Sequence, residues 1–154
     1  MSQEGAALVE TAFASTVFLA FLFGIFQMSQ ALYISSYLSN ASRQASRYAM
    51  VRGSTSCTNT SGLSNCNLTT NAQIQSYVQG LGYPGITNKN VTATITFLSA
   101  SSTTPTTWTV CATACNEPGN LVKVVVSYTF RIHIPFSYTA TPAMTSTSQM
   151  VISQ

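Results

Sequence analysis

The feature that most constrains this sequence is a predominantly apolar run from Thr11 to Met28, which follows directly after the carboxylate of Glu10. From Thr11 to Gln30 a helix rises about 30 Å at 1.5 Å per residue, which matches the hydrocarbon core of a bilayer. A signal-peptide core is normally about 7–15 apolar residues followed by a small-residue cleavage site, whereas this run is longer and no such site stands out at its end. We therefore predict a retained membrane-spanning helix.

The helical pattern continues beyond the apolar run, because apolar residues then recur at intervals of three and four along one face. These positions are Ile34, Leu38, Ala41, Ala45, Tyr48 and Ala49. Tyr33 and Tyr37 are expected to lie in an interfacial aromatic belt. The pattern predicts one helix of roughly 45 residues from Ala6 to Val51, ended near Gly53 and lying half in lipid and half outside it.

The remaining residues predict a small head in which short strands and turns alternate. We expect a short helix at Ala72–Gln79, and Leu121–Ile134 has the strongest β pattern. Further strands are expected at Val91–Leu98, around Trp108–Ala112 and, with a weaker pattern, around Met144–Ile152, with a Ser/Thr-rich loop at Ser99–Thr107. The predicted fold class is α+β: a long N-terminal membrane-spanning helix that extends into a small head with a short antiparallel sheet.

The head is unusually poor in charge. Charged residues make up 6% of the 154 residues, against about 25% in an average soluble protein, so its polar surface must consist of Ser, Thr, Asn and Gln. The formal net charge is +3, and its cations are scattered rather than interleaved with aromatics in one patch. Nucleic-acid binding therefore has little support.

All four cysteines follow the apolar run: Cys57, Cys66, Cys111 and Cys115. An even number on one side of a membrane segment indicates disulfides in an oxidising compartment. Three pairings are possible, and the local one, Cys57 with Cys66 and Cys111 with Cys115, needs the least organisation of the chain. A zinc site fits the spacing poorly, and neither pair has the two intervening residues of a redox motif.

No catalytic constellation is visible, since the chain has no Asp, one His and three Glu. A Ser-His-acid triad or a pair of acids in one cleft would need more than this. His133 is best interpreted as a residue on the polar face of a strand, and a metal site built on it lacks nearby carboxylates. We therefore predict a non-enzyme with no cofactor and no metal.

Glu10 is the residue that calls for an explanation, because a carboxylate at the edge of the lipid must snorkel, be protonated or meet a positive partner. If the chain were cut after Gly5, Ala6 would carry a free ammonium roughly 6 Å along the helix axis from Glu10. Two staggered helices would then pair the Glu10 of one subunit with the N-terminus of another. The alternative is a solvated acid at a helix N-terminus, where the helix dipole favours it.

The stretch Gly5–Glu10 resembles a type IV prepilin peptidase site, with cleavage after the glycine and a glutamate at the fifth mature position. The continuation resembles TadE-like proteins of the tight-adherence (Flp, type IVb) pilus system. The residues that carry it are Phe23–Phe26, Ala31–Tyr33, Ser39–Arg43, Arg47–Ala49 and Val122–Tyr128, followed by Phe130 and Pro135.

The resemblance implies a minor pilin or pseudopilin with a leader at 1–5, a transmembrane and amphipathic helix at 6–52 and a disulfide-containing head at 53–154. It implies four kinds of partner: the prepilin peptidase, other pilus subunits, inner-membrane assembly proteins and membrane lipid. The sister family TadF remains open as an assignment. An alternative function is that of a single-pass, membrane-anchored periplasmic binding protein.

Two signals disagree on the side of the membrane on which the head lies. No Lys or Arg precedes the apolar run and three Arg follow it, so the positive-inside rule favours a cytoplasmic head. The cysteines and the neutral surface favour an oxidising compartment. We expect a protein of the bacterial inner membrane with a periplasmic or extracellular head, and a true start codon upstream that supplies a basic leader.

Overall fold

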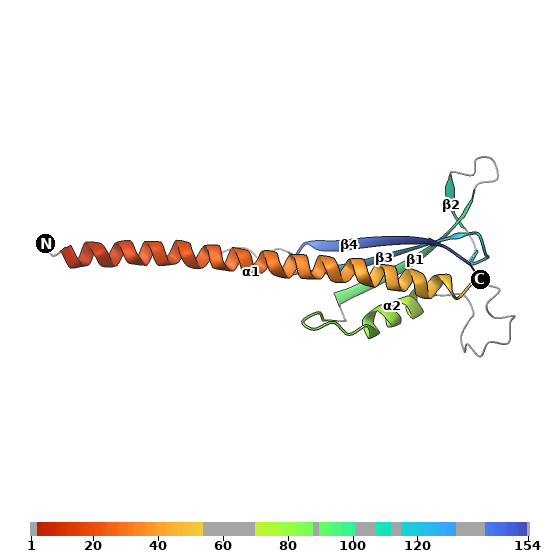
Figure 1. The fold of residues 1–154 in the computed structure, drawn as a ribbon, viewed down its shortest axis with the longest axis horizontal. Coiled ribbons are helices and arrows are strands. Elements are labelled where there is room, and N and C mark those ends of the chain that lie inside the picture. Colours follow the sequence, from red (N-terminus) through yellow and green to blue (C-terminus); the bar gives the residue numbers. More distant parts are fainter. Residues whose placement is uncertain are drawn as a thin grey trace. The chain divides into compact units, whose positions relative to one another are not determined.

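The computed structural model describes residues 3–53, 70–87, 90–100, 107–111, 115–131 and 141–153 (Figure 1). The elements in chain order are α1 (Gln3–Met50), α2 (Asn71–Gly80), β1 (Val91–Ala100), β2 (Trp108–Val110), β3 (Leu121–Thr129) and β4 (Ala143–Val151). The chain divides into two compact units, Met1–Ile34 and Ser35–Gln154, which are described separately below. The predicted α+β class with a long N-terminal helix is confirmed.

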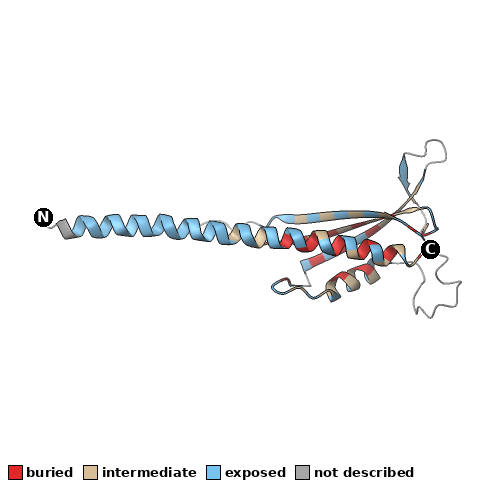
Figure 2. Cartoon of the chain, viewed as in Figure 1, coloured by how far each residue is buried: buried red, intermediate tan, exposed pale blue. Residues whose placement is uncertain are grey.

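The first unit contains the N-terminal part of α1, in which every residue from Gly5 to Phe26 is exposed (Figure 2). Its large apolar side chains include Phe13, which is 72% exposed, and Phe26, which is 59% exposed. This is the one helix in the described part of the chain that is long and apolar enough to span a membrane, with a mean hydropathy of 1.9 over an 18-residue window. Apolar exposure along a whole helix is expected where lipid replaces water.

The second unit is the head, and the C-terminal part of α1 supplies one wall of its core. The buried residues of this part recur at helical spacing, as predicted, and are mostly small: Tyr37, Leu38, Ala41, Ser42, Ala45, Ser46 and Ala49. Helix α2 adds Ile74 and Val78, both 0% exposed. It begins at a capping box, because Thr70 and Gln73 satisfy each other's backbone N–H groups.

The sheet is antiparallel, with the strand order β2-β1-β3-β4. Alternate residues of the two central strands are buried, because one face of the sheet covers the core and the other faces outward. Val91, Ala93 and Ile95 of β1 lie opposite Tyr128, Val126 and Val124 of β3. The outward face of β1 carries Thr92, Thr94 and Thr96, and the Thr92 and Ser127 hydroxyls are hydrogen-bonded to each other there.

The strand predicted at Leu121–Ile134 ends earlier, at Thr129. Phe130 N–H still donates to Pro142 C=O, at 3.1 Å, but proline has no N–H to return, so the ladder stops there. His133 lies outside the described residues, as does most of the predicted loop at Ser99–Thr107. The weaker strand prediction near the C-terminus is confirmed by β4.

Candidate functional site

The predicted processing site lies in the first turns of α1. Gly5, Ala6 and Glu10 are all helical and exposed. A Cβ atom built on Gly5 would meet nothing within 4 Å, and Gly5 is not among the glycines with positive φ. Nothing in the fold of the chain itself therefore demands a glycine at this position.

Glu10 is the only charged residue between Gly5 and Ser42. The hydroxyl groups near it are turned back onto the helix: Thr11 Oγ1 donates to Ala7 C=O at 3.1 Å and to Leu8 C=O at 3.0 Å, and Ser15 Oγ donates to Thr11 C=O at 2.7 Å. Such internal bonds let a hydroxyl enter an apolar environment without an unsatisfied donor. Glu10 is thus the one charged group of the apolar segment.

A disulfide joins Cys111 and Cys115, which confirms one of the two local pairs favoured by the sequence. Its two ends are tied to neighbouring elements: Cys111 N–H donates to Phe97 C=O, and Asn120 Nδ2 donates to Cys115 C=O, both at 3.1 Å. Cys57 and Cys66 lie outside the described residues. No group of three His, Cys, Asp or Glu residues in the described ranges is arranged to hold a metal ion.

Tyr37 is not in the expected aromatic belt but in the core of the head, where it is 3% exposed. Its ring contacts that of Tyr83, with centroids 4.4 Å apart. Burial raises the pKa of Tyr37 above 10.0, and the neighbouring Tyr83 and Tyr128 raise this pKa further. Tyr37 therefore stays protonated at neutral pH, and its ring packs against that of Tyr83.

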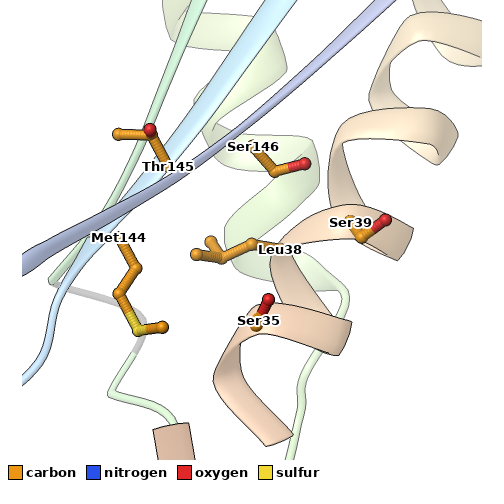
Figure 3. A pocket seen from close by; sticks show the side chains of 6 residues that line it. All are labelled: Ser35, Leu38, Ser39, Met144, Thr145 and Ser146. Atoms are coloured by element: carbon orange, nitrogen blue, oxygen red, sulfur yellow. The ribbon is translucent and has the colours of Figure 1, made fainter. Parts of the chain in front are cut away.

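A groove of about 360 Å³ lies between α1 and β4 (Figure 3). Its lining is neutral and consists of Ser35, Leu38, Ser39, Met144, Thr145 and Ser146. Leu38 points from α1 toward β4, and next to the groove the Ser42 and Ser146 hydroxyls are 3.1 Å apart. None of these described lining residues carries a charge. The groove could not be predicted from the sequence, because it is formed by residues about a hundred positions apart.

The long apolar N-terminal helix fits a single-pass membrane anchor by its length and composition. Residues 5–47 match the family model of TadE-like proteins, so the resemblance expected from the sequence is confirmed for the N-terminal helix. No curated protein and no solved structure matches the chain.

Proposed function

We propose that this chain is a TadE-like minor pseudopilin, anchored in the bacterial inner membrane by α1 and required for assembly of a Tad pilus. The observation that carries the proposal is the TadE-like match at residues 5–47, which covers the exposed apolar part of α1, includes Glu10 and continues into the segment of α1 that is buried in the head. In this proposal the helix mediates assembly. The head, which adds a domain beyond the helix, is the reason for assigning the chain to the minor class.

Prepilin peptidase removes residues 1–5 in this proposal, which leaves Ala6 as the new N-terminus. The open space around Gly5 supports this role, because a glycine that packing does not require is explained by an external enzyme that reads it. Cleavage also creates a positive charge in a segment that otherwise has none before Arg43.

The new ammonium of Ala6 then pairs with Glu10 of a neighbouring subunit. The two groups are separated by roughly 6 Å along the axis of one helix, so an intermolecular pair requires a stagger of about one turn between adjacent helices. A charge-assisted contact contributes roughly 1.5–3 kcal/mol, which corresponds to about a 10- to 150-fold change in an association constant. The pair fixes the register of the helices as well as adding affinity.

The head lies in the periplasm or outside the cell in this proposal. The Cys111–Cys115 disulfide supports this placement, because such bonds persist in oxidising compartments and are rare in the cytosol. The low charge of the head is typical of the same environment.

Piliation of cells that carry Glu10→Ala or Glu10→Gln tests the role of the carboxylate. Both variants are expected to insert in the membrane at normal levels but to reduce the number of pili about tenfold or more. Ser29→Ala is the matched control, because Ser29 is an exposed polar residue of the same helix, bonded to Ile25 C=O at 3.0 Å. Normal piliation in the Glu10 variants would remove the pairing mechanism. Normal piliation after deletion of the gene, with loss of a binding activity, would favour an anchored binding protein instead.

A further inference from the structure

The two edges of the head sheet differ in how their outward backbone groups are hydrogen-bonded. On one edge, β2 covers only the last three residues of β1, and side chains of α2 bond to part of the rest. Asn71 Oδ1 accepts a hydrogen bond from Ile95 N–H at 2.7 Å, and Gln79 Nε2 donates to Val91 C=O at 3.4 Å. Polar side chains therefore replace a neighbouring strand along this edge.

The other edge is β4, and its backbone groups face alternately toward β3 and away from it. Phe130 N–H donates to Pro142 C=O, and Ile152 N–H donates to Asn120 C=O. These are directly opposed pairs in the β3–β4 register, so by antiparallel alternation the even-numbered residues of β4 bond to β3. The odd-numbered residues turn their N–H and C=O groups outward: Ala143, Thr145, Thr147, Gln149 and Val151.

These outward groups form an open hydrogen-bonding edge. All five side chains are exposed, and among the described residues no hydrogen bond reaches these groups. Natural sheets protect long edges with charged residues, prolines or bulges. β4 has none of these, since its nine residues are uncharged, contain no proline and follow β3 in unbroken register.

We propose that β4 pairs in antiparallel fashion with β4 of a second copy of this chain, about a two-fold axis at Thr147. The sequence of the strand identifies the occupant, because it is nearly self-complementary about that residue. Met144 meets Met150, Ser146 meets Ser148, and Ala143 meets Val151, while Thr145 meets Gln149. Like therefore pairs with like in every position, and no charge opposes another copy.

The hydrogen-bonding pattern selects the same centre. The two-fold axis must bring odd-numbered residues opposite odd-numbered residues, so that outward N–H and C=O groups face each other. A centre at Thr147 does this and overlaps all nine residues of β4, which yields about ten backbone hydrogen bonds. The product is one continuous sheet formed by the two heads, in the isologous arrangement typical of homodimers.

The segment of α1 that belongs to the head runs alongside β4. Ser35 and Leu38 lie beside Met144, and Ser42 bonds to Ser146, so this part of α1 runs in the same direction as β4 (Figure 3). In the antiparallel pair, the two head segments of α1 therefore run in opposite directions along the joined sheet. This pairing of heads does not depend on the proposed role in pilus assembly.

Cysteine cross-linking of the full-length protein in detergent tests the register. The Thr147→Cys variant is expected to form a disulfide-linked dimer on mild oxidation, because opposed residues have Cα atoms about 5.5 Å apart. Thr145→Cys and Gln149→Cys are each expected to remain monomeric alone but to cross-link when mixed. Wild-type protein gives the background from the native cysteines. Absence of a dimer with Thr147→Cys, or equal dimer yields for all three single variants, would overturn the proposal.

Charge at the two-fold axis tests the pairing without cysteine chemistry. In detergent, the wild-type protein is expected to elute as a dimer in size-exclusion chromatography, and Thr147→Lys or Thr147→Glu to elute as a monomer through like-charge repulsion at the axis. Mixing the two variants is expected to restore the dimer, a rescue that a folding defect does not produce. Thr94→Lys, on the outward face of β1 away from the edge, is the control and should dimerise like wild type. Dimer formation by either single variant at the wild-type level, or failure of the mixture to dimerise, contradicts the proposal.

Discussion

The bond between Asn71 and Ile95 is a sharp test of how the head closes the β1 edge. Asn71→Ala removes the acceptor of the 2.7 Å hydrogen bond and leaves the N–H of Ile95, a residue 9% exposed, without that partner. An unsatisfied buried donor costs about 1–3 kcal/mol. With an unfolding entropy of about 2.1 cal/mol/K per residue, a head of roughly 120 residues loses about 4 °C of melting temperature per kcal/mol. The expected decrease is therefore about 4–12 °C.

Thermal unfolding of the full-length protein in detergent, followed by near-UV circular dichroism of the aromatic residues in the head, measures this decrease. Asn71→Asp keeps an acceptor oxygen at the same place and is expected to lie within about 1 kcal/mol of wild type, helped by its position at the start of α2. Asn40→Ala removes the same side chain from an exposed position of α1 and should be neutral or slightly stabilising. If Asn71→Ala has the same melting temperature as Asn40→Ala, Asn71 does not stabilise the β1 edge.

Three further variants test the core, the disulfide and the tyrosine cluster. Leu38→Ala, at a position 1% exposed, should cost about 2–5 kcal/mol in the head, whereas Leu32→Ala, at a position 63% exposed, should leave denaturant unfolding of the head unchanged. Replacing both Cys111 and Cys115 by Ser should cost about 2 kcal/mol, from the entropy of a five-residue loop, and reductant should lower the stability of wild type more than that of the variant. The raised pKa of Tyr37 means that the folded head holds this proton more tightly than the unfolded chain, so its contribution is complete below pH 10.0 and is lost as the pH rises through the folded pKa. Urea unfolding above and below pH 10.0 should show this loss in wild type and less of it in Tyr37→Phe; equal losses would contradict the assignment.

The long helix could be predicted because its signal is local and repeated. An apolar run and a three-four spacing each define a helix without reference to the rest of the chain, and the structure joins them in α1. The same spacing places Tyr37 between Ile34 and Ala41 on the buried face, yet a tyrosine near a membrane boundary is equally typical of an aromatic belt. Only the packing of the head decides between the two. The burial of Ser42 and Ser46 likewise depends on contacts with the sheet.

The candidate site also contains residues that a local motif predicts and contacts that only the fold creates. Gly5, Ala6 and Glu10 could be proposed from the sequence because a peptidase site is a contiguous motif, and their roles stay predictions. The Cys111–Cys115 bond belongs to one of three pairings that the sequence left open. The contact of Asn71 with Ile95 and the groove beside β4 could not be predicted, because each joins elements whose relative placement is set by the order of the strands. The open edge of β4 follows from that order as well.

The proposal that this protein is a processed pseudopilin is tested most directly by its intact mass. The full-length chain is expressed in membranes with and without a prepilin peptidase, purified in detergent and measured by mass spectrometry. We expect the peptidase to remove residues 1–5 and to leave Ala6 as the N-terminus. Gly5→Val adds a side chain where the fold has room for one, and it should block this cleavage. Retention of residues 1–5 with a peptidase that cleaves a known substrate in the same membranes would contradict processing of this chain.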